Sequence, residues 1–205
     1  TSVTFNQATP AGFYAHVEKR TEYPKIAAQA YAANYDLIMG YGVSGLKETV
    51  AAEDAQKAGV QVFNKSHDEF FKLKSLTKPT LVFREFGYEM NRQKNNTARP
   101  LNEYTAKAIE LLSKDNPKGF FMMVEGGKID WGGHANNTLA TMTELQEFDK
   151  AVGKALEFYK KYPNDTLIVV TADHNTGGLG LPAKLSADLP AKLAENNAKF
   201  NGIKF

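Results

Sequence analysis

The chain has 205 residues, of which 42% are hydrophobic and 23% charged, an ordinary composition for a globular domain with its own core. Its 25 basic and 23 acidic side chains leave a net charge of +2 without a basic block, so electrostatics give no support for nucleic-acid binding. The lack of cysteine excludes disulfides and thiolate metal ligands, and no apolar run reaches the ~20 residues that a membrane-spanning helix needs.

Strands and helices are predicted to alternate along the first part of the chain. A weakly alternating run over residues 1–6 indicates a strand, and Thr9 followed by Pro10 indicates the start of a helix that reaches about Arg20. Short apolar runs then predict buried strands, separated by helices. In chain order these are a helix over 24–34, a strand over 37–40, a helix over 47–58, a strand over 60–63, a helix over 67–73 and a strand over 80–83.

The same alternation continues in the second part. Residues 85–100 are polar and weakly patterned, which predicts a long surface excursion. A helix over 101–113 precedes a five-residue apolar run at 120–124, which predicts a buried strand. Apolar side chains at spacings of three and four from Leu139 to Tyr159 then predict a long helix, and a β-branched strand is expected over 166–170. This order predicts one α/β domain, a three-layer α/β/α sandwich with a largely parallel central sheet.

Acidic side chains follow two of the predicted strands. Glu125 comes directly after the run at 120–124, and Asp173 with His174 follows the run at 166–170. In open α/β sheets, ligands bind beyond the carboxyl ends of the strands. The fold is therefore expected to carry these side chains to a common rim.

A second pair of polar residues lies close to Glu125. Asp130 and His134 are four residues apart, a spacing that aims both side chains the same way on a helical turn, with glycines between them and before them. Carboxylate oxygen and imidazole nitrogen are normal zinc ligands. Each feature alone also fits a solvated strand end or a hydrogen-bonded turn, but the two clusters together indicate a metal site.

Three segments resemble the alkaline phosphatase family. Residues 124–136, read from Val124 to Asn136, are similar to its V-E-G-x-x-I-D-x-x-x-H-A segment, and residues 169–174 are similar to its V-T-A-D-H segment. Residues 7–20, with Q-A-T-P-A-G at their start and Arg20 at their end, resemble a third segment of the family. The three occur in the family's order along most of the chain.

The resemblance implies a role for each matched residue. Glu125 and Thr9 would bind magnesium, and Arg20 would clamp the phosphate oxygens. Asp130 and His134 would hold one zinc ion. The other zinc ion would be held by Asp173 and His174. Gln7 and Trp131 fall at positions near the metals where family members vary.

The chain also departs from the family's pattern. It has no D-S-A-x-x-T-A type segment with the nucleophilic serine, no upstream aspartate that bridges the metals, and no histidine after His174. We therefore expect a piece of a longer phosphate monoesterase that is inactive by itself. Another enzyme of the same superfamily, such as a phosphodiesterase, sulfatase or mutase, and a non-catalytic metal-binding domain are the alternatives.

The resemblance also implies the surroundings of the parent enzyme. Its substrate would be a phosphomonoester and its product inorganic phosphate, with two zinc ions and one magnesium ion as cofactors. No nucleic acid and no membrane span are expected. Relatives are typically exported and often dimeric, so we expect a periplasmic or extracellular location and a homodimer.

Overall fold

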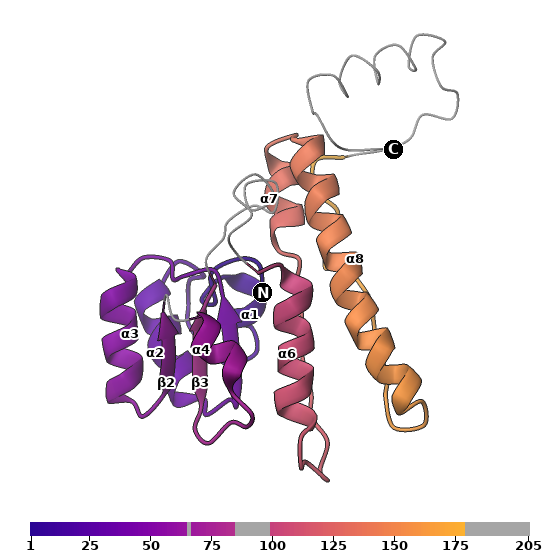
Figure 1. Cartoon of the computed structure of the whole chain (residues 1–205). Helices are drawn as coiled ribbons and strands as arrows, with labels where there is room; N and C mark the ends of the chain where they lie inside the picture. Colours follow the sequence, from indigo (N-terminus) through magenta and orange to yellow (C-terminus); the bar gives the residue numbers. More distant parts are fainter. Residues whose placement is uncertain (65–66, 85–98, 179–205) are drawn as a thin grey trace.

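The computed structural model describes residues 1–64, 67–84 and 99–178. Within these ranges, β1 (Leu37–Gly40), β2 (Gln61–Asn64) and β3 (Thr80–Phe83) form a parallel sheet in the order β1-β3-β2 (Figure 1). The central β3 pairs in register with both neighbours. Strands that alternate with helices around a parallel sheet confirm the predicted α/β class.

Helices cover both faces of this sheet because β3 is apolar on both sides. Leu81 and Phe83 pack into a core with α2 (Tyr23–Ala32) and α3 (Glu48–Lys57). Val82, which points to the opposite face, packs with Phe63 and with side chains of α4 (His67–Lys72) and α6 (Leu101–Ser113). The sheet is thus the middle layer of three.

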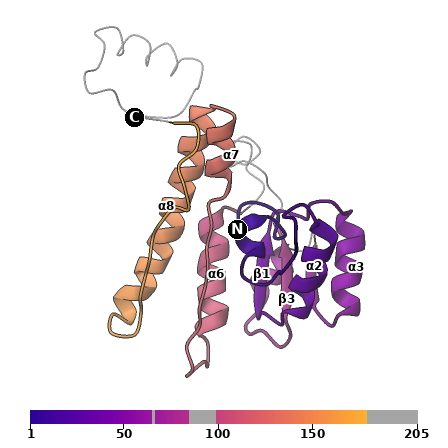
Figure 2. The same ribbon diagram turned by 180° about the vertical axis from the view of Figure 1, so that it is seen from behind.

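The second part of the chain extends the layer formed by α6. α7 (Lys128–His134) and α8 (Thr138–Lys161) follow, and both Figure 1 and Figure 2 show α6 between the sheet and α8. Phe120 and Phe158 are in ring contact at 5.7 Å between centroids. After α8 the chain turns back and runs in extended form along that helix as far as α7 (Figure 2).

The N-terminal residues bridge the sheet and the segment before α7. The amide of Tyr41, just past β1, donates to the carbonyl of Val3 at 2.8 Å, and the amide of Ser2 donates to the carbonyl of Glu125 at 3.1 Å. The amino group of Thr1 donates to the carbonyl of Met39 at 2.9 Å. Residues 1–3 are therefore fixed by backbone contacts on two sides, although they form no regular strand.

Two predicted strands are absent from the sheet. Residues 120–124 and 166–170 have no regular secondary structure, and Leu167 and Val169 are 87% and 73% exposed. Their composition favours strands, but a strand also needs a partner to complete its hydrogen bonds, and neither run is paired with a strand within the described ranges. The interpretation of these runs as buried strands was wrong for this chain.

The predicted helix from Thr9 to Arg20 is also much shorter than expected. Only α1 (Ala8–Ala11) forms, and Gly12 ends it while its amide still donates to the carbonyl of Ala8. Residues 12–14 form a turn and residues 15–17 have no regular structure, so Arg20 lies in a later turn and not on a helix. The remaining predicted helices agree with the structure to within two residues at either end.

The expected surface excursion over residues 85–100 falls outside the described residues except for its last two positions. Residues after Gly178 also lie outside them. Among the helices that the structure does describe, none combines the length and apolar character that a membrane crossing requires.

Candidate metal centre

α7 carries the first pair of candidate ligands. Asp130 and His134 lie one turn apart on this helix, as the spacing predicts, and Nε2 of His134 is 3.5 Å from Oδ1 of Asp130. The His134 side chain is 72% exposed and that of Asp130 35% exposed. A pair this open to water is held together weakly, so both groups remain available to a ligand.

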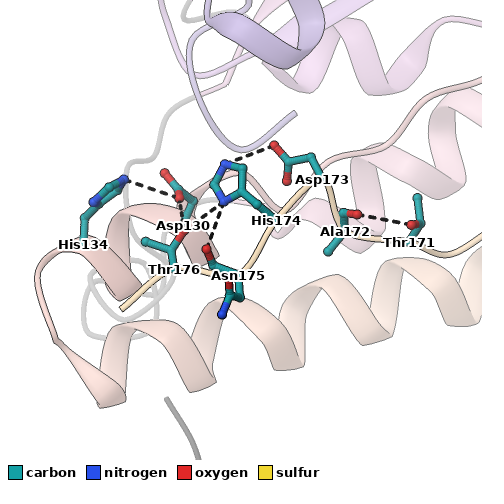
Figure 3. A network of polar contacts seen from close by, with 8 residues as sticks. All are labelled: Asp130, His134, Thr171, Ala172, Asp173, His174, Asn175 and Thr176. Atoms are coloured by element: carbon teal, nitrogen blue, oxygen red, sulfur yellow. Dashed lines mark hydrogen bonds and ion pairs between the residues drawn. The ribbon is translucent and has the colours of Figure 1, made fainter. Parts of the chain in front are cut away.

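The second pair reaches α7 through Thr176. Its hydroxyl donates to Oδ1 of Asp130 at 2.6 Å and lies 3.1 Å from Nδ1 of His174 (Figure 3). Oδ2 of Asp173 lies 3.4 Å from Nε2 of His174. A continuous chain of polar contacts therefore runs from His134 through Asp130, Thr176 and His174 to Asp173.

The contacts of Thr176 define the tautomer of His174. Because the Thr176 hydroxyl gives its proton to Asp130, its oxygen accepts from the protonated Nδ1 of His174, which also lies 3.1 Å from the carbonyl of Asn175. In the neutral ring, this tautomer has its lone pair on Nε2, which lies 3.4 Å from Oδ2 of Asp173. Hydrogen bonding of the other ring nitrogen is the usual way in which proteins orient a metal-ligating histidine.

Glycine makes the close approach of the two segments feasible. A Cβ on Gly133 would come within 2.8 Å of the carbonyl oxygen of Thr176, and one on Gly177 would come within 2.5 Å of the carbonyl oxygen of Gly133. Gly177 also has a φ of +77°, which favours glycine. The backbone of residues 176–177 can therefore lie directly against α7.

Glu125 lies at the start of this region, next to the N-terminal segment. The hydroxyl of Thr1 donates to its Oε2, and its backbone carbonyl accepts from Ser2. A Cβ on Gly127 would lie 3.0 Å from the Glu125 carboxyl group and 2.9 Å from Cγ1 of Val3, so one of these side chains would have to shift. The carboxylate is half-buried and its position is fixed by residues far away in the sequence.

The structure does not join the other predicted residues to this cluster. Within the described ranges, no hydrogen bond or ion pair connects Thr9 on α1, or the exposed Arg20, to α7 or to residues 171–176. Gln7 instead donates to the hydroxyl of Ser44 at 3.2 Å. Their roles therefore rest on the sequence pattern.

Lys128, at the start of α7, was missed by the sequence interpretation. Its ammonium lies 4.2 Å from the ring centroid of Trp131 and 4.7 Å from that of Tyr41. Burial lowers the pKa of Lys128 to about 8, the carboxylate of Glu144 opposes this, and the charge of Arg84 adds to it. Thr176 was also missed. A lysine or threonine beside a glycine-rich motif carries no pattern that could have identified these contacts.

Because two of the candidate ligands are histidines, this set of side chains suits a zinc ion better than magnesium or calcium. Two imidazoles and two carboxylates lie beside α7, all partly exposed to solvent. In the part of the chain that the structure describes, no three His, Asp or Glu side chains converge closely enough to hold a metal ion. The candidate ligands are thus arranged as two separate pairs of one carboxylate and one imidazole each.

Comparison of this chain with known proteins shows the family that it resembles. The family model described as alkaline phosphatase matches residues 1–200. Alkaline phosphatase 4 of Bacillus subtilis is 33% identical over 193 residues, which cover 87% of this chain and 40% of that protein. Alkaline phosphatase of Escherichia coli is 52% identical over 84 residues, or 41% of this chain and 17% of that protein.

Solved structures give the same result. The cold-active alkaline phosphatase of Shewanella sp. superimposes with a TM-score of 0.77 at 34% identity, over 89% of this chain and 44% of that chain. The enzyme of the Antarctic bacterium TAB5 gives 0.74 at 34% identity, over 91% and 55%. The chain belongs to the alkaline phosphatase family. It spans about 40% of the length of the Bacillus subtilis relatives that it matches.

Proposed function

We propose that this chain is the part of a metal-dependent phosphate monoesterase that supplies most of its metal ligands. The observation that carries the proposal is the contact chain from Asp130 through Thr176 to His174, since it joins two motifs 40 residues or more apart. Membership of the alkaline phosphatase family supplies the reaction, which is hydrolysis of a phosphomonoester to an alcohol and inorganic phosphate.

The residues divide into three ligand groups. Asp130 and His134 would hold one zinc ion, and Asp173 with Nε2 of His174 would hold the second. Glu125 and Thr9 would hold magnesium, which prefers oxygen ligands. One relative supports the last choice, because its structure is described as a variant of the TAB5 enzyme with Mg bound.

Bound metal ions would supply positive charge for the attacking and leaving oxygens of an in-line displacement at phosphorus. The chain's own residues prepare for this. Thr176 orients Asp130 and selects the His174 tautomer that presents Nε2. Arg20 would bind the phosphate oxygens, for which its planar guanidinium is suited, and it is exposed and accessible.

We propose that the 205-residue chain alone does not turn over substrate. It has no D-S-A-x-x-T-A type segment to provide a nucleophilic serine, and no histidine after His174. Export to the periplasm or the cell exterior, and a homodimeric parent enzyme, are further parts of the proposal that family membership supports.

Zinc titration of the purified chain tests this assignment. Calorimetry should detect weak zinc binding, because each ion lacks part of its ligand set, and Asp173→Asn with His174→Gln should remove one of the two sites. p-Nitrophenyl phosphate should not be hydrolysed. His16→Gln, which removes an exposed histidine remote from α7 in the sequence, is the matched control and should leave binding unchanged.

Three results would oppose the proposal. Zinc binding that is equally lost in His16→Gln would indicate nonspecific coordination by surface histidines. Hydrolysis of the substrate by the wild-type chain would show that the missing serine segment is not needed. Zinc bound tightly and stoichiometrically would show that the ligands present form complete sites.

A further inference from the structure

Lys128 has an environment that differs from that of an ordinary surface lysine. It is only 2% exposed, although it opens a helix of seven residues at the edge of the molecule. Its ammonium lies between two aromatic rings, with Trp131 of the same helix at 4.2 Å and Tyr41 from the end of β1 at 4.7 Å. A cation over an aromatic face is attracted by the ring quadrupole, more strongly where water is excluded.

Further contacts connect the same residue to three other segments. The backbone amide of Lys128 donates to the hydroxyl of Ser2 at 3.2 Å. Glu144 on α8, itself 3% exposed, attracts the ammonium electrostatically, and Arg84 at the end of β3 repels it. Lys128 therefore lies where the N-terminal segment, β1, α7 and α8 meet.

Trp131 gives these contacts a relation to the candidate site. It directly follows Asp130 and stands three residues before His134, within a helix of two turns. In so short a helix, the orientation of one large side chain constrains the whole turn, because few backbone hydrogen bonds hold it. The helix is packed on one side by α8 at Gly132, where a Cβ would meet the backbone of Thr141.

We propose that Lys128 is a positioning residue whose ammonium holds the Trp131 indole towards Tyr41 and thereby fixes the turn of α7 that carries Asp130 and His134. The metal-binding consequence rests on the function proposed above, whereas the ring arrangement does not. Lys128 thus acts through Trp131 and touches no substrate or ligand itself.

Tryptophan fluorescence tests the ring arrangement directly, because Trp131 is the single tryptophan of the chain. Lys128→Met keeps an unbranched side chain of nearly the same length and removes the charge, so the indole should become more mobile and its acrylamide quenching constant should rise about twofold. Lys128→Arg keeps a cation and should restore the wild-type value. Thermal melts followed by circular dichroism establish that each variant is folded.

A second variant covers the case in which Lys128→Met fails to fold. Tyr41→Leu removes the Tyr41 ring and leaves the lysine in place, so it should also raise the quenching constant. Tyr41→Phe keeps an aromatic ring and should leave the quenching constant unchanged. The proposal would be overturned if quenching were unchanged in every folded variant that lacks the Lys128 charge or the Tyr41 ring.

Zinc affinity supplies the second measurement. Lys128→Met should bind zinc several-fold more weakly than the wild-type chain, and Lys128→Arg should recover the affinity. An increase in quenching without any loss of affinity would overturn the link to Asp130 and His134. If the wild-type chain bound no zinc at all, the proposed function would fail, while the fluorescence results would still decide the role of Lys128 in holding the indole.

Discussion

Asn6 shows how one buried amide can organise a loop next to the sheet. Its side chain is fully buried, donates to the carbonyls of Tyr23 and Ser44 at 3.2 and 2.9 Å, and accepts from the amide of Ser44 at 2.8 Å. All three partners are backbone groups. Without Asn6 they would lose their partner in a place that water reaches poorly.

We expect Asn6→Ala to lower the free energy of unfolding by about 3 kcal/mol, because buried backbone groups are left unsatisfied. Asn116 is a matched control, since it also donates to two carbonyls and accepts from one amide but is only half-buried. Asn116→Ala should cost clearly less. Urea unfolding of both variants measures the difference, and equal losses would show that burial does not set the cost.

Tyr31 presents the opposite case, a buried hydroxyl without a partner. Within the described residues its Oη makes no hydrogen bond, and the ring packs against Phe5 in the core. Burial raises the pKa of Tyr31 to about 12, and the carboxylate of Asp54 adds to this. The folded state therefore favours the neutral phenol, whose contribution is complete below pH 10 and is lost as the pH rises towards 12.

Tyr31→Phe should therefore raise the free energy of unfolding at pH 7, by up to about 1 kcal/mol, since it removes an unsatisfied polar group. It should also weaken the loss of stability between pH 10 and 12. Tyr14→Phe should do the reverse at pH 7, because the Tyr14 hydroxyl donates to the carbonyl of Phe5. Denaturant unfolding at several pH values measures this, and a destabilised Tyr31→Phe would mean that its hydroxyl has a favourable contact.

At the scale of elements, α7 depends on the absence of side chains at its contact with residues 176–177. A Cβ on Gly133 would have to displace the Thr176 backbone, which would carry the Thr176 hydroxyl away from Asp130. Gly153 on α8 differs, since a Cβ there would meet no atom within 4 Å. The two helical glycines thus form a matched pair.

Gly133→Ala should lower the free energy of unfolding by about 1–3 kcal/mol and change the ring resonances of His174 in NMR spectra. Gly153→Ala should raise it by up to about 1 kcal/mol, because alanine favours the helix more than glycine does. If Gly133→Ala left both the stability and the His174 resonances unaltered, the contact between the two segments would be looser than the distances indicate.

The elements also show what the sequence could and could not determine. The helix over residues 101–113 was predicted to the residue, because its apolar stripe is a local property. The runs at 120–124 and 166–170 were misinterpreted because strand formation depends on a partner that a local pattern cannot supply. The spacing of Asp130 and His134 predicted that their side chains point the same way. The roles of Thr176 and Lys128 could not be predicted, because they arise from contacts between distant segments.

For the whole molecule, the main consequence of two apolar runs that form no strand is exposed apolar surface. Leu167, Val169 and Val170 are 87%, 73% and 60% exposed, and Phe121 in the run at 120–124 is 73% exposed. A folded protein rarely leaves an extended apolar run in water, and such surface promotes association. The chain is therefore expected to self-associate at high concentration.

Val169→Lys should lower the weight-average mass in sedimentation experiments and reduce binding of the dye ANS, since it interrupts the apolar run. Asn164→Lys adds the same charge at an exposed position of the same return segment without removing apolar surface, and it should have a much smaller effect. Equal effects of the two variants would attribute the change to net charge and not to the apolar run.

The length of α8 also sets the number of extended residues that the returning chain needs to reach α7. The 24 residues of α8 rise about 36 Å, and about 11 residues of extended chain cover the same length, which is close to the span from Tyr162 to Asp173. Seven residues inserted after Glu157 would lengthen the helical arm by about 10 Å and should pull Thr176 away from Asp130. Three residues added to the return segment as well should restore the match, and the His174 resonances would report each step.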